Sequence, residues 1–74
     1  MKPWVDVWGD VDDGKLVRPE RLLIDKIHSF YRDPEYKDIT RVRTGDPAHN
    51  HDEFFYQGSF DELTSIVEQW YASR

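Results

Sequence analysis

The sequence predicts an α+β protein: a small two-layer sandwich in which two helices cover one face of a three- to four-stranded, mainly antiparallel sheet. Several short segments alternate apolar and polar residues, which is typical of strands. Two longer segments repeat apolar residues every three or four positions, as amphipathic helices do. Two such helices need a shared apolar surface, and a sheet supplies it. The 74 residues make one domain, with frayed ends expected at residues 1–3 and 73–74.

The first strand is predicted where the pattern Trp-Val-Asp-Val-Trp begins, at Trp4. Val5 and Val7 share one face of this strand, and Trp4, Asp6 and Trp8 share the other. Because a carboxylate is rarely buried without a partner, we expect the valines to face inward and the two indoles to flank Asp6 on the outer face. Tryptophan is well buried on average, so packing of one indole around a sheet edge onto a helix remains open.

A hairpin and a first helix are predicted next. The turn is Asp12-Asp13-Gly14-Lys15, because Asp-Gly supplies the positive backbone angles of a tight turn. A short second strand is expected over residues 15–17. Pro19 and Glu20 suit the first turn of a helix over residues 20–32. Its apolar stripe is Leu23, Ile24, Ile27, Phe30 and Tyr31.

The second half of the chain is predicted to form two strands and a helix. Residues 37–44 form a charged strand that contains Ile39 and Val42, residues 45–52 a polar loop, and residues 53–57 a strongly apolar strand. Ser59 and Glu62 have the spacing of a capping box. The helix that follows runs to about residue 72, with a buried stripe of Phe60, Leu63, Ile66, Val67, Trp70 and Tyr71.

Composition excludes several classes of protein. The absence of cysteine excludes disulfides and thiolate zinc sites and fits a reducing compartment. No apolar run approaches the ~20 residues that cross a bilayer, so we expect a cytoplasmic protein without a membrane partner. The small interior leaves little room for a ligand pocket. We therefore expect no enzyme, no cofactor, and a monomer or weak dimer.

Two segments suggest metal sites. The acidic segment that starts at Asp10 fails as a calcium loop, because Gly14 falls at the fifth position and not the sixth. His49 and His51 on an extended segment would point the same way and could share a metal with Asp46 or Glu53. His28 is the remaining histidine. Isolated loop histidines are usually solvated, so we expect no resident metal.

A basic strip of Lys37, Arg41 and Arg43 supports an alternative function. Arg41 and Arg43 share one strand face, and the aromatics nearby are Tyr36, Phe54 and Tyr56. Basic groups interleaved with rings are typical of a small RNA- or DNA-binding domain. The net charge of −5 opposes such binding, and the strip could instead pair with acids such as Asp38 and Glu53. A second alternative is a metal-dependent or histidine-based phosphodiesterase that uses the same arginines.

The acidic N-terminal segment supports the leading hypothesis. Four aspartates lie close in sequence to two tryptophans, and the predicted partner-binding residues are Trp4, Asp6, Trp8, Asp10, Asp12 and Asp13. Aromatic anchors inside a charged rim are typical of a protein-binding surface. We expect a small acidic regulator that docks on a larger basic, nucleic-acid-processing protein. RNA polymerase is one example, with a transcription regulator or a phage-type inhibitor or antiterminator as the role.

Overall fold

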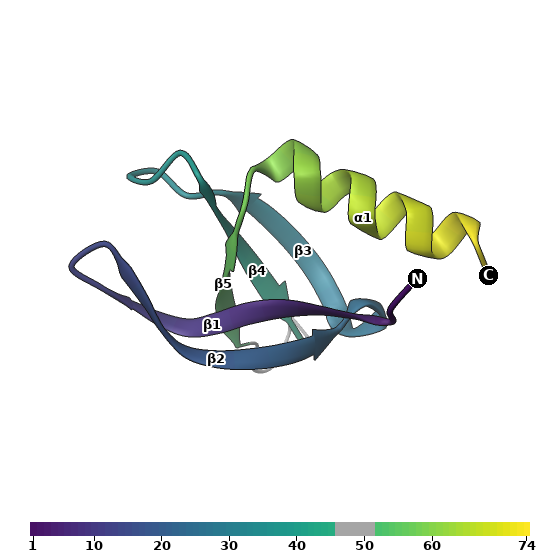
Figure 1. The fold of residues 1–74 in the computed structure, drawn as a ribbon, viewed down its shortest axis with the longest axis horizontal. Helices are drawn as coiled ribbons and strands as arrows, with labels where there is room; N and C mark the ends of the chain where they lie inside the picture. Colours follow the sequence, from purple (N-terminus) through teal and green to yellow (C-terminus); the bar gives the residue numbers. More distant parts are fainter. Residues whose placement is uncertain (46–51) are drawn as a thin grey trace.

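The computed structural model describes residues 1–45 and 52–74, and these form five strands, one α-helix and a single 3₁₀ turn (Figure 1). The elements in chain order are β1 (Trp4–Asp12), β2 (Lys15–Leu23), η1 (Ile24–Lys26), β3 (Ile27–Arg32), β4 (Ile39–Thr44), β5 (Glu53–Gln57) and α1 (Phe60–Ala72). The sheet has the order β2-β1-β5-β4-β3, and every neighbouring pair is antiparallel.

The predicted fold class is wrong in its number of strands and helices. The segment predicted as a helix over residues 20–32 forms the end of β2, the turn η1 and the strand β3. A β-bulge explains the error. The register of β3 against β4 shifts between Ile27 and Ser29, so that Ile27 pairs with Thr44 and Phe30 pairs with Val42. Thr44 and Val42 are both buried on one face of β4, so the bulge puts Ile27 and Phe30 on the same face at a spacing of three, which imitates a helix.

Pro19 lies within a strand and does not begin a helix. Pro19 belongs to β2 and pairs with Trp8 of β1. Because β2 is an edge strand, it can accommodate a residue without a backbone N–H. The preceding Arg18 has a positive φ of 62°, and its Nη2 donates to the Gly9 carbonyl at 3.0 Å. A proline on an edge strand is tolerated, and here β2 continues past it to Leu23.

Three short-range predictions are confirmed: the hairpin turn, the bounds of β5 and the cap at Ser59. Asp13 and Gly14 have φ values of 50° and 80°, as the predicted hairpin turn requires. The strand β5 has the predicted bounds. Ser59 caps α1, with the Glu62 amide donating to its hydroxyl oxygen at 3.1 Å. The Glu62 carboxylate lies near Tyr56. Burial of the Tyr56 hydroxyl is the main cause that raises its pKa to about 12, and the charge of the Glu62 carboxylate is the second.

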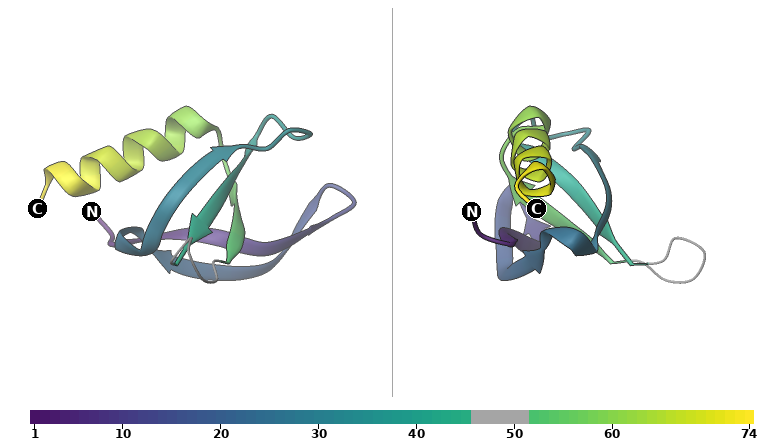
Figure 2. Two further views of the ribbon diagram at one scale, coloured as in Figure 1. Left: turned by 180° about the vertical axis from the view of Figure 1, so that it is seen from behind. Right: turned by 90° about the vertical axis from the view of Figure 1, so that its right-hand side faces the viewer.

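One hydrophobic core joins α1 to the concave side of a strongly bent sheet. Figure 2 shows α1 running across the opening between the β1–β2 hairpin and the strands β3 to β5. The core residues are Val5, Val7, Ile24, Val42, Tyr56, Leu63 and Trp70. The valine face of β1 therefore lies inward, as predicted. The Pro3 carbonyl accepts a hydrogen bond from the Ile24 amide at 2.8 Å, which attaches the start of the chain to η1. Within the described residues, no helix combines the length and the apolar composition that a membrane crossing requires.

Candidate binding surface

The face of the sheet directed away from α1, here called the outer face, carries a row of paired residues across the strands. Trp8 pairs with Pro19 on one side and with Phe55 on the other. Phe55 pairs in turn with Arg41, and Arg41 with Tyr31. The Arg41 guanidinium lies 5.4 Å from the centre of the Phe55 ring. Trp8 is thus the end of an aromatic row and is not an isolated indole.

Both indoles of β1 are partly buried. Trp4 contacts two cations of its own chain: the Arg21 guanidinium lies 4.9 Å from the ring centre and the Lys2 ammonium 5.8 Å. Arg21 also faces Asp6 at 3.8 Å, with both side chains mostly exposed. An exposed pair at this distance contributes little to stability, so Asp6 remains accessible to a partner.

Trp4 and Trp8 line the same cavity, which we call the indole hollow. Its volume is about 610 Å³, and Asp6, Tyr56 and Ile66 also line it. The hollow exists because β1 and β5 diverge. Among the described residues the two strands pair only through Trp8 and Phe55, and β5 ends at Gln57, after which the chain turns into α1. The lining of the hollow therefore combines Trp4, Asp6 and Trp8 from the outer side of β1 with core-side residues and with Ile66 of α1.

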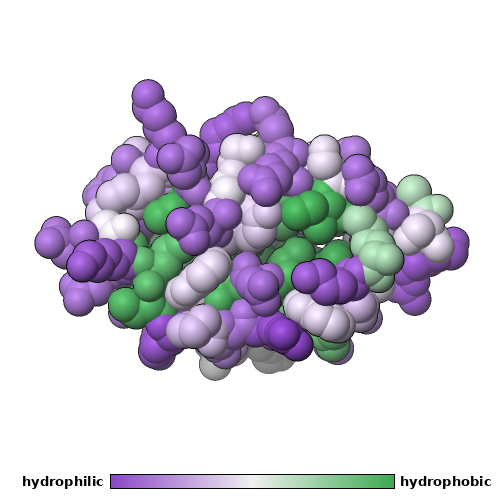
Figure 3. All heavy atoms as spheres, viewed as in Figure 1, coloured by the Kyte–Doolittle hydropathy of each residue, from purple (hydrophilic) through white to green (hydrophobic). Residues whose placement is uncertain are grey.

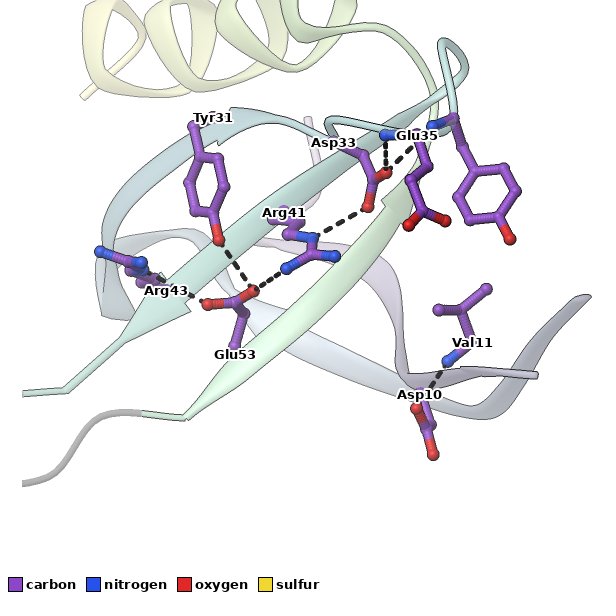
Figure 4. A network of polar contacts seen from close by, with 9 residues as sticks. Asp10, Val11, Tyr31, Asp33, Glu35, Arg41, Arg43 and Glu53 are labelled. Carbon is purple, nitrogen blue, oxygen red and sulfur yellow. Dashed lines mark hydrogen bonds and ion pairs between the residues drawn. The ribbon is translucent and has the colours of Figure 1, made fainter. Parts of the chain in front are cut away.

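The predicted basic strip belongs mainly to an ion-pair network, shown in Figure 4. The Arg41 Nε donates to Asp33 at 2.8 Å, and its Nη1 donates to Glu53 at 3.3 Å. Arg43 Nε donates to the other Glu53 oxygen at 3.3 Å, and the Tyr31 hydroxyl donates to Glu53 at 2.9 Å. We call Tyr31, Asp33, Arg41, Arg43 and Glu53 the arginine network. Pairing with Glu53 was predicted, whereas the second acid is Asp33 and not Asp38.

Asp33 is the centre of this network, and its side chain is completely buried. Besides the Arg41 guanidinium, it accepts hydrogen bonds from the backbone amides of Glu35 and Tyr36 at 2.8 and 2.9 Å. Burial acts to raise the pKa of Asp33, but the hydrogen bond from Arg41, the two amide bonds and the Arg41 charge outweigh it and hold the pKa below its ordinary value. Two of the three strip residues are therefore neutralised, and Lys37 alone stays outside the network.

The three remaining predicted acids form the acidic hairpin: Asp10, Asp12 and Asp13. All three are exposed at the end of the β1–β2 hairpin that projects from the molecule (Figure 1). Because successive side chains of a strand point to opposite faces, Asp10 and Asp12 lie on the same side of β1 as Trp8. Asp10 accepts a hydrogen bond from the Val11 amide at 2.8 Å. Within the part of the chain described, none of the three forms an ion pair.

The predicted histidine site is largely outside the described residues, since Asp46, His49 and His51 all fall in the segment 46–51. His28 lies exposed in β3 beside Ser29, at 3.3 Å from its hydroxyl oxygen. Over residues 1–45 and 52–74, the structure contains no cluster of three or more metal-ligating side chains.

Sequence reasoning missed Phe55 and assigned its neighbours to the wrong face. Phe54 and Tyr56, expected to extend the basic strip, pair with Val42 and Thr40 on the core face. Phe55 instead shares the outer face with Glu53. The polar residues at both ends of β5, Glu53 and Gln57, alternate with Phe55. This period-two pattern was the signal that places the half-buried Phe55 ring on the outer face.

Comparisons of the chain with protein-family models, with curated proteins and with solved structures found no match.

Proposed function

We propose that this protein is a small protein-binding regulator that docks on a larger, basic, nucleic-acid-processing protein through the outer side of β1. One observation carries the proposal: Trp4, Asp6 and Trp8 line a single hollow at the foot of the exposed acidic hairpin. An aromatic recess beside free carboxylates fits a partner that presents an arginine or lysine side chain.

The Trp4 ring supports this choice of partner chemistry. It already contacts the Lys2 and Arg21 cations of its own chain, so a cation is a suitable neighbour for this indole. A partner's basic side chain would displace Lys2, stack on the indoles and face Asp6. Such a cation–π contact contributes about 0.5–2 kcal/mol, depending on how fully it is desolvated. The acidic hairpin would raise the rate of encounter with a basic surface.

The surface favours a few anchoring side chains over one broad apolar contact. Figure 3 shows the hydrophobic residues of one face in small groups separated by hydrophilic ones. In many interfaces a few residues, often tryptophan, carry most of the binding energy. Trp8 is the strongest candidate here because it belongs both to the aromatic row and to the indole hollow.

The arginine network weakens the alternative of a nucleic-acid-binding strip. Arg41 already pairs with Asp33 and Glu53, and Arg43 pairs with Glu53, so phosphates would have to compete with carboxylates held in place. RNA polymerase remains our example of the partner class, because an enzyme that holds nucleic acid exposes the basic surface that an acidic hairpin can approach.

The test is a Trp8→Ala variant. Proteins captured from lysate on the immobilised wild-type protein are identified by mass spectrometry, and one is purified for affinity measurements. We expect Trp8→Ala to weaken its binding by about 10-fold or more, as an anchoring residue would. Tyr71→Ala is the matched control, because Tyr71, which was predicted to be buried, is an exposed ring on α1 and does not line the indole hollow.

Circular dichroism and urea unfolding separate lost binding from lost folding. If Trp8→Ala does not fold, Trp8→Phe replaces it and is expected to weaken binding by less while keeping the fold. Equal binding by the wild type and a folded Trp8 variant would reject the surface. Captured proteins without basic surfaces would reject the partner class.

A further inference from the structure

A second cavity, here called the loop hollow, opens on the other side of Trp8. Its volume is about 600 Å³, above the ~300 Å³ at which small-molecule pockets begin. Trp8, Ile39 and Gln57 contribute from the sheet, and the walls come from two loops that project in the same direction (Figure 1). The residues of these walls are Gly14, Lys15 and Leu16 at the turn and the start of β2, and Tyr36, Lys37 and Asp38 of the β3–β4 connection.

The Tyr36 wall of this hollow is held from two sides. Its backbone amide donates to the buried Asp33 carboxylate at 2.9 Å. On the other side, a side-chain carbon at Gly14 would lie 3.8 Å from the Tyr36 ring, so ring and turn are close neighbours. Gly14 also has a φ of 80°, which favours glycine at this position. The arginine network thus positions a loop that lines the hollow.

The charge of the loop hollow differs from that of the whole protein. Lys15 and Lys37 line it with a single acid, Asp38, whereas the chain has a net charge of −5. Neither lysine has an ion-pair partner among the described residues. Their two cations are therefore available to an anionic ligand, unlike those of Arg41 and Arg43.

We propose that the loop hollow binds a nucleotide. The base would stack on the Trp8 or Tyr36 ring, since aromatic side chains bind every base through its π-face. The phosphate would lie between Lys15 and Lys37. A purely apolar ligand would leave the lysines unused, and inorganic phosphate would leave the rings unused. A free nucleotide and the terminal residue of a single-stranded nucleic acid share this chemistry. The site goes beyond the docking proposed at the indole hollow, with which it shares Trp8 and Gln57.

The test is a titration of the isotope-labelled protein with adenosine monophosphate, followed by NMR. We expect shifts of the Trp8 indole and of the Gly14 and Tyr36 amides. Lys15→Ala and Lys37→Ala should each weaken binding about fivefold, the size of an exposed charge interaction, and added salt should weaken it further. Lys26→Ala is the matched control, because Lys26 is an exposed lysine in η1 and its removal changes the net charge equally.

Adenosine and inorganic phosphate, titrated separately, test the two halves of the proposal, and each should bind more weakly than the nucleotide. Tighter binding of a single-stranded oligonucleotide would assign the site to a strand end, and equal binding would assign it to the free nucleotide. The proposal is overturned if the nucleotide leaves the Trp8, Gly14 and Tyr36 signals unchanged. It is also overturned if Lys37→Ala binds as well as Lys26→Ala, or if adenosine binds as well as the nucleotide.

Discussion

The charged groups on the two halves of the sheet are held in different ways. In the half formed by β3 to β5, Arg41 pairs with Asp33 and Glu53, Arg43 pairs with Glu53, and the Asp33 side chain is completely buried. In the half formed by β1 and β2, the aspartates of the acidic hairpin extend into water without ion-pair partners in the described structure. The first arrangement stabilises the fold, and the second leaves charge available for recognition. A cluster of charges thus indicates binding only where its members do not neutralise one another.

The largest expected effect is loss of stability in Asp33→Ala. This change removes a buried carboxylate with three hydrogen bonds and leaves two amides and the Nε of the partly buried Arg41 without their acceptor. We expect a decrease of about 3 kcal/mol in the free energy of unfolding, measured with urea. Asp25→Ala, which removes an exposed aspartate of η1, should change it by less than about 0.5 kcal/mol. Equal effects of the two substitutions would contradict the difference between the halves.

A smaller effect is expected from acidification of the wild-type protein. The pKa of Asp33 is lower in the folded protein than its ordinary value, so the unfolded chain takes up this proton more readily. The resulting stabilisation is present above the ordinary aspartate pKa and is lost as the pH falls through the lower, folded value. Urea midpoints measured against pH should therefore fall more steeply for the wild type than for Asp33→Ala. Parallel curves would show that Asp33 is not the group responsible.

The smallest effect on stability is expected at the acidic hairpin. A variant with Asp10→Asn, Asp12→Asn and Asp13→Asn should keep its free energy of unfolding within about 0.5 kcal/mol, because asparagine tolerates the same turn. Association with a basic partner should become slower and less sensitive to salt, while dissociation changes little. Stopped-flow kinetics at several salt concentrations would measure both rates. A main effect on dissociation would mean that the aspartates form direct contacts and do not only steer approach.

The elements predicted correctly are those whose sequence signal lies within a few consecutive residues. The Ser59 cap starts α1 through its own hydroxyl, and Asp13 and Gly14 form the turn through their own backbone angles. The segment 20–32 was predicted wrongly because its apolar spacing is compatible with two structures. A helix produces that spacing by its period, and here a bulge in β3 produces it.

The features of the candidate surfaces also fall into those that could be predicted from neighbouring residues and those that could not. Alternation along β1 was enough to separate the valine face from the side of Trp4, Asp6 and Trp8, because neighbouring side chains on a strand point to opposite faces. Three other arrangements depend on the pairing of distant strands. They are the contact of Arg41 with Asp33, the position of Phe55 beside Trp8, and the position of Lys15 and Lys37 around one hollow. Side-chain alternation is a local property of the backbone and can be read from neighbours, whereas these contacts arise from the order of the strands and the bend of the sheet.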